Sequence, residues 1–251
     1  MKGPGWTLGG LSAAGLAVLF WLYGGDIADY SRATEAPVSA LSELPRLWFA
    51  VVALAAGSVA AGAFAFGLAR RRGPEYRGYR LAPIAVVVAL FVDLLVPASV
   101  SVPGGSAERL ALALQLFRAR AEDLATPRGV PDRPEALEPL LAELGPPPYL
   151  VAGRRAPGFS LQVRTGCSGP VAEAPGAAVG TLVYCVASDR SRAWVSAVAL
   201  PAETRFGAPA VFSRRGVAQA VVVMAPTSDD GAESEPGSAA EDSGPTEPAR
   251  P

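Results

Sequence analysis

Three long apolar segments dominate the first hundred residues, and polar loops separate them. They cover residues 6–23, 47–69 and about 81–100. A helix needs about 20 apolar residues to cross the hydrocarbon core of a membrane, and each segment is close to that length. The pattern predicts a region of three transmembrane helices over residues 1–100.

A different spacing of apolar positions begins after residue 105. Between residues 106 and 125 the apolar side chains recur every three or four positions, which predicts an amphipathic helix with one stripe facing a core. The stripe consists of Leu110, Leu114, Phe117, Ala121 and Leu124.

The spacing then changes to two, which predicts strands. The β-prone segments are 159–163, 179–186, 194–200 and 217–224. Because the helices precede the strands, residues 101–225 are expected to form a small α+β domain, with an antiparallel sheet packed on the long helix.

Composition narrows the classes of function. Half of the residues are hydrophobic, the net charge is −1 and there is no histidine. The small net charge argues against nucleic acid as a partner, and the missing histidines exclude Ser–His and Cys–His catalysis and His-ligated metals. No phosphate-binding or dinucleotide-binding glycine motif is present. We therefore expect a protein that is not an enzyme and needs no cofactor or metal.

The charges of the loops predict how the helices are oriented. Residues 24–45 carry four acidic residues and one arginine, whereas residues 70–80 are strongly basic. Arginines in short loops stay on the cytoplasmic side of a membrane. The N-terminus is then cytoplasmic, and everything after residue 100 is extracytoplasmic. The basic residues concerned, which are also candidates for contact with lipid headgroups, are Arg70, Arg71, Arg72, Arg77 and Arg80.

The first apolar segment has an alternative interpretation as a cleaved signal peptide, since Lys2 precedes it. The sequence after it offers no clear small-x-small cleavage site. Cleavage would leave the orientation of the rest unchanged.

Small residues in the second segment predict close helix packing. Gly57, Ala61 and Gly62 lie among alanines that recur every fourth position, and such spacing lets helix backbones approach closely. The alternatives are the lining of a pore and a seam between two copies of the chain.

Asp93 in the third segment is a candidate intramembrane polar site. A carboxylate in the hydrocarbon region is unfavourable, which makes it a hypothesis for a proton or cation relay or for pairing with a partner helix. A structural role in a protonated or hydrogen-bonded state is the alternative.

Cys167 and Cys185 are the two cysteines. Two thiolates are too few for a structural zinc site, and an extracytoplasmic position favours a disulfide between them. The bridge would fasten the segment between them to the sheet.

The last residues, 226–251, are acidic and lack large apolar side chains, which predicts a disordered tail. All but one of the 22 basic residues are arginine, as is typical of GC-rich bacterial genomes. The leading hypothesis is an integral protein of the bacterial inner membrane. Its periplasmic or extracellular domain would contact or assemble other envelope proteins, with membrane lipids as the remaining partners. The alternative is a small transport or channel subunit that uses Asp93.

Overall fold

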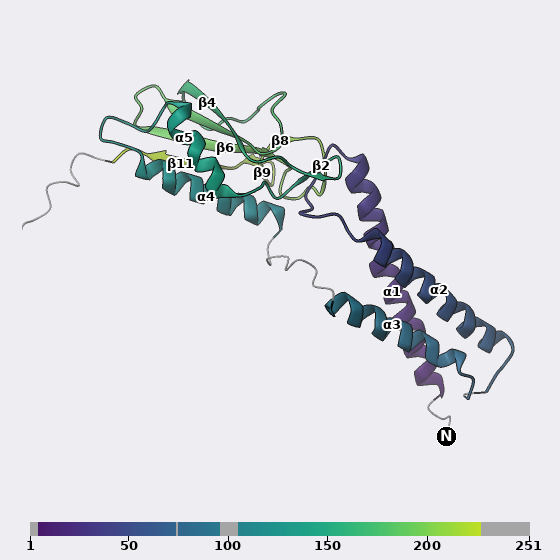
Figure 1. Ribbon diagram of the computed structural model, residues 1–251. Helices are drawn as coiled ribbons and strands as arrows, with labels where there is room; N and C mark the ends of the chain where they lie inside the picture. Colours follow the sequence, from purple (N-terminus) through teal and green to yellow (C-terminus); the bar gives the residue numbers. More distant parts are fainter. Residues whose placement is uncertain (1–4, 74, 96–104, 227–251) are drawn as a thin grey trace, which may run out of the picture.

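The protein consists of a bundle of three helices and an outer domain of helices and sheets (Figure 1). The computed structural model describes residues 5–73, 75–95 and 105–226, and the side chains of residues 10, 12–73, 75–92 and 105–226. The predicted disordered tail, residues 226–251, lies outside the described residues except for Pro226.

The bundle is formed by α1 (Gly5–Glu35), α2 (Leu47–Ala69) and α3 (Gly78–Leu95). Leu19 and Tyr23 of α1 meet Ala50 and Ala53 of α2 in one buried cluster. Among the described residues, α2 is the one helix long and apolar enough to cross a membrane, with a mean hydropathy of 2.1, and the apolar part of α3 is shorter. Three transmembrane helices therefore remain a prediction.

Helix α1 extends well beyond the predicted apolar segment 6–23. The prediction of a loop from residue 24 is wrong, because residues 24–35 continue the helix. These residues contain no proline, and Thr34 donates its hydroxyl to the Ser31 carbonyl within the helix. The helix ends just before Pro37, which cannot supply the next amide donor. Its last turns leave the bundle and reach the outer domain (Figure 1).

The predicted small residues of α2 differ in what they face. Gly57 is buried, and a Cβ atom added there would lie 2.8 Å from Cδ2 of Leu19. Ala61 is partly buried beside the cluster of Leu16, Ala60 and Ala82. Gly62 has nothing within 4 Å of the same added atom and points away from the bundle. Close packing therefore uses Gly57 and Ala61, and Gly62 takes no part in it.

The outer domain contains α4 (Ser106–Asp123), α5 (Pro134–Leu141) and a short 3-10 helix, η1 (Ala142–Leu144). Its main sheet has the order β11-β6-β5-β4, with β8 also paired to β6. These strands are β4 (Ser160–Cys167), β5 (Thr181–Ala187), β6 (Arg192–Ala199), β8 (Ala210–Val211) and β11 (Ala220–Met224).

The antiparallel sheet is confirmed for β5, β6 and β11, while β4 pairs with β5 in parallel. A parallel connection needs about a dozen residues or more, and residues 168–180 supply it without a helix. The alternation of residues 159–163 predicts a strand but not that it is parallel to its neighbour. Two further short strands, β9 (Ser213–Arg214) and β10 (Val217–Ala218), pair with each other in a separate antiparallel hairpin.

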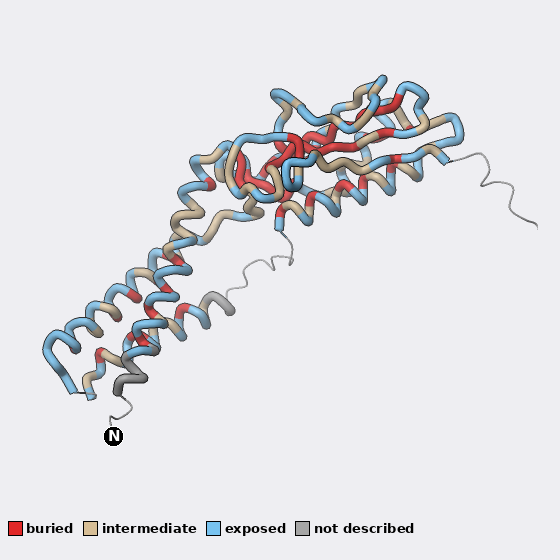
Figure 2. Tube along the Cα trace, turned by 180° about the vertical axis from the view of Figure 1, so that it is seen from behind, coloured by how far each residue is buried: buried red, intermediate tan, exposed pale blue. Residues whose placement is uncertain are grey.

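The main core lies between α4 and the sheet, where buried positions concentrate (Figure 2). The apolar stripe of α4 is confirmed for Leu110, Leu114, Phe117 and Ala121, which are all buried. Leu124 is 43% exposed, since the helix ends at Asp123 and the next residue no longer follows the stripe. Strand β5 is buried along its whole length.

Replacement of Gly57 by leucine tests the packing of the bundle. Gly57→Leu is expected to lower the free energy of unfolding by about 1–3 kcal/mol, because the new side chain overlaps Leu19. The matched control, Gly62→Leu, gains the same helix propensity on the open face of α2 and is expected to cost less than about 0.5 kcal/mol. Loss of helical circular dichroism on heating in detergent measures both. An equal loss at Gly62 would contradict the packing described.

Candidate functional sites at the junction and on the outer sheet

The loop between α1 and α2 supplies a strand to the outer domain. Val38 and Ser39 form β1, which lies between β2 (Leu150–Val151) and β7 (Phe206–Gly207) in a small sheet. Its order is β3-β2-β1-β7, with β3 at Arg154–Arg155, and all its pairs are antiparallel. Two further bonds extend it, from the Ala40 amide to the Arg205 carbonyl (2.8 Å) and from the Ala152 amide to the Pro37 carbonyl (3.1 Å).

Side chains strengthen this junction around β1. Val38 is 2% exposed and belongs to the main core of the outer domain. The Ser106 hydroxyl at the start of α4 donates to the Ala40 carbonyl at 2.9 Å. Arg205 pairs with Asp29 of α1 at 2.7 Å, and Arg155 pairs with Glu43 of the loop before α2. The outer domain is therefore held on α1 and on the loop that leads into α2.

The five predicted basic residues gather at the opposite end of the bundle, between α2 and α3 (Figure 1). All five are exposed. Arg70 follows α2 and lies 5.5 Å from the centre of the Phe66 ring, and the Arg72 amide donates to the Gly67 carbonyl at 3.0 Å. Arg71 has a φ of 47°, so the chain turns sharply there. Arg77 precedes α3 and Arg80 lies in its first turn.

Asp93 lies in the last turn of α3. Its side chain is outside the described residues, so the structure does not test the relay hypothesis.

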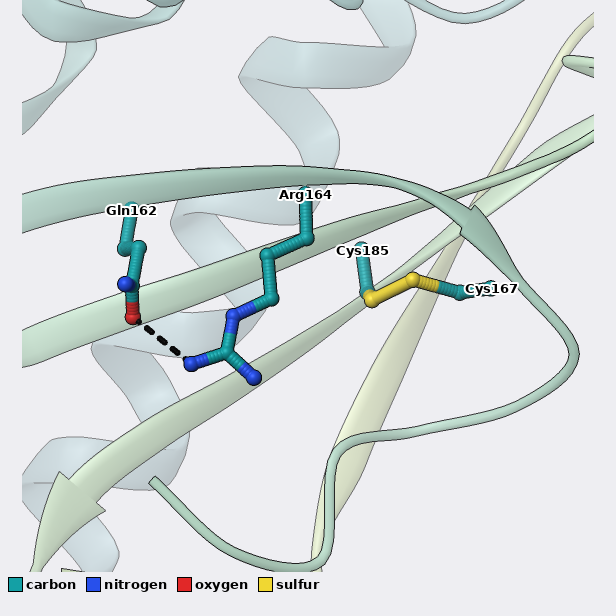
Figure 3. Close-up of a disulfide and its surroundings, with 4 residues drawn as sticks. All are labelled: Gln162, Arg164, Cys167 and Cys185. Carbon is teal, nitrogen blue, oxygen red and sulfur yellow. Dashed lines mark hydrogen bonds between the residues drawn. A yellow bond between two sulfur atoms is a disulfide. The ribbon is translucent and has the colours of Figure 1, made fainter. Parts of the chain in front are cut away.

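Cys167 and Cys185 form the expected disulfide, which joins β4 to its parallel neighbour β5 (Figure 3). Their Cα atoms are 5.8 Å apart, and Cys185 is buried. The bridge closes the crossover of residues 168–180 at its base. By the chain-entropy account, a closed loop of this size contributes about 3 kcal/mol to stability.

An apolar patch lies on the face of the main sheet that points away from α4. Trp194 of β6 is paired in register with Val222 of β11, and Arg192 is paired with Met224. Residues paired in this way share a face of the sheet. Met224 is 51% exposed, and the Arg192 guanidinium lies 5.9 Å from the Trp194 ring centre. We call these four residues the β6–β11 patch.

A groove of about 430 Å³ lies beside α4. Its apolar walls include Leu112, Leu116, Leu144, Pro146 and Phe159. Ser42 and Glu43 also line it, so it reaches the segment that leads into α2 at Leu47. We call it the α4 groove.

Two arginines give the α4 groove its charge. Arg155 is paired with Glu43, which leaves the positive charge of Arg109 without an ion pair among the described residues. The Nε atom of Arg109 is buried and has no hydrogen-bond acceptor within the same part of the chain. A buried donor left without an acceptor costs about 1–3 kcal/mol.

Several groups elsewhere in the outer domain have shifted pKa values. Burial and the negative charge of Glu108 raise the pKa of Tyr149, and burial with the charge of Asp132 raises the pKa of Tyr184. Both phenols therefore stay protonated at physiological pH. Asp189 has a lowered pKa because it accepts hydrogen bonds from Ser191 within a turn. In the parts of the chain that the structure describes, no three side chains of the metal-binding types gather into a site.

Sequence reasoning missed both the β6–β11 patch and the α4 groove. The patch follows from alternation, because Val222 and Met224 are two positions apart in a strand, as are Arg192 and Trp194. The groove gave no such signal. Leu112 and Leu116 stand outside the stripe used for the core, and Arg109 and Arg155 are 46 residues apart.

No protein-family model, curated protein or solved structure matches this chain. The function therefore rests on the geometry of its own residues.

Proposed function

We propose that this chain is a non-enzymatic integral membrane protein whose extracytoplasmic domain contacts and helps assemble other proteins of the bacterial envelope. The observation that carries the proposal is the β6–β11 patch on a domain that is held to the helices through β1. Trp, Met and Arg are enriched in protein interfaces relative to the rest of the surface, and the patch combines all three.

The three helices act as the anchor in this proposal. The outer faces of α2 and α3 carry large apolar side chains, among them Val59 at 69% and Val87 at 63% exposure. In water such a surface would be unfavourable, whereas lipid tails cover it without cost. The domain organisation is then a membrane region over residues 1–100, an outer domain over 101–225 and a tail over 226–251.

The orientation follows from charge. The arginines between α2 and α3 lie at one end of the bundle and the outer domain lies at the other (Figure 1). With the arginines and the N-terminus cytoplasmic, the outer domain is periplasmic or extracellular, in an oxidising compartment that suits its disulfide. The arginines then face anionic lipid headgroups, each contributing about 1 kcal/mol near the surface.

Fusions to alkaline phosphatase, which is active only outside the cytoplasm, test the orientation. A fusion after Pro226 is expected to be active and one after Gly73 inactive, since the charged segment around Gly73 resists translocation. Matched expression levels by immunoblot serve as the control. The reverse pattern of activity would overturn the proposed location of the outer domain.

Site-specific photocrosslinking in living cells tests the contact surface. A photoreactive amino acid in place of Met224 is expected to give discrete adducts of higher mass with another membrane or envelope protein. The matched control is the same replacement at Gln162, an exposed polar position on β4 of the same sheet. Adducts at Gln162 and none at Met224 would rule out the β6–β11 patch as the contact surface.

A further inference from the structure

The α4 groove combines an apolar interior with one unbalanced positive charge. Its volume of about 430 Å³ falls within the range of about 300–1,000 Å³ typical of small-molecule sites. Leu112 is 71% exposed although it lines the groove, and no described residue covers it. A ligand that fits needs an apolar chain and a negatively charged head.

The groove lies close to the proposed membrane surface. Ser42 and Glu43 in its lining stand five and four residues before the first residue of α2. The helix α4 itself runs along the side of the outer domain that is nearer to the end of α3 (Figure 1). Lipids of the adjacent leaflet are therefore the nearest source of an apolar chain with a charged head.

The acidic tail of this chain offers charge without an apolar part. Residues 227–251 contain seven acidic residues and no large apolar side chain, so they cannot fill walls made by Leu112, Leu116 and Phe159. A neutral lipid fits the walls but leaves the charge of Arg109 unbalanced. The anionic lipid satisfies both features.

We propose that the α4 groove binds an anionic phospholipid of the outer leaflet, with one acyl chain against Leu112, Leu116 and Phe159 and the phosphate at Arg109. The guanidinium of Arg109, which lines the groove, then gains a charged acceptor in the phosphate oxygens, and a charged acceptor makes a hydrogen bond stronger than a neutral one does. This inference rests on the membrane anchoring proposed above. It adds a lipid site on the outer domain itself, distinct from the arginines between α2 and α3.

Photolabelling of the full chain in nanodiscs tests the site. One set of discs contains phosphatidylglycerol with a diazirine in its acyl chain, and the other contains phosphatidylcholine with the same group. After irradiation, labelled peptides are mapped by mass spectrometry. We expect phosphatidylglycerol to label α4 around Leu112 and Leu116 about fivefold more than phosphatidylcholine does. Both lipids are expected to label α2 around Val59 equally.

Two variants and one control assign the labelling to the groove. Arg109→Gln is expected to bring α4 labelling by phosphatidylglycerol down to the phosphatidylcholine level, whereas Arg133→Gln, at an exposed arginine outside the groove, leaves it unchanged. Leu112→Asp, at a position too exposed to disturb folding, is expected to remove α4 labelling by both lipids.

The labelling of α2 separates the two proposals. If α2 is labelled and α4 is not, the lipid site is overturned while the anchoring stands. The same conclusion follows if the two lipids label α4 of the unaltered protein equally. If Arg133→Gln loses as much α4 labelling as Arg109→Gln does, the lipid site is also overturned. If α2 itself stays unlabelled, the anchoring fails and the lipid site falls with it.

Discussion

The insertion of β1 between β2 and β7 is the constraint on which the arrangement of the molecule depends. The two residues of β1 belong to the loop between α1 and α2, yet they complete a sheet of the outer domain. Burial of the Val38 side chain contributes about 1.5–3 kcal/mol. The exposed ion pairs at the junction contribute about 0–1 kcal/mol each. The burial of β1 and its backbone hydrogen bonds therefore contribute more to the stability of the junction than the ion pairs of Asp29 and Glu43 do. These ion pairs fix the direction in which α1 and the loop approach the outer domain.

This junction explains why α1 is longer than a membrane span requires. Its last turns carry Asp29 to Arg205 and bring the chain to Pro37, directly before β1. A partner that binds the β6–β11 patch would act on a domain already joined to α1 and to the loop that leads into α2. Force or displacement at the patch would then reach the bundle through β1, and not only through the chain between α3 and α4.

Some elements could be predicted because their signal is local. The core stripe of α4 repeats every three or four residues, the apolar segments stand out by composition, and the two cysteines left one pairing. The junction could not be predicted, since Val38 and Ser39 are too few to show a period and their partners lie more than 100 residues away. The parallel pairing of β4 was missed because alternation along a strand carries no information on its direction. The α4 groove likewise depends on Arg109 and Arg155 meeting only in the folded chain.

Hydrogen exchange at the junction tests the central claim most directly. In the full-length protein in detergent, the amides of Ala40 and Ala152 donate to Arg205 and Pro37 and are expected to exchange as slowly as amides of the buried strand β5. The amides of Ala172 and Glu173, which are exposed in the crossover between β4 and β5, provide the fast reference. If Ala40 and Ala152 exchange at that fast rate while β5 stays protected, β1 is not part of the outer domain, and the coupling of that domain to the helices is contradicted.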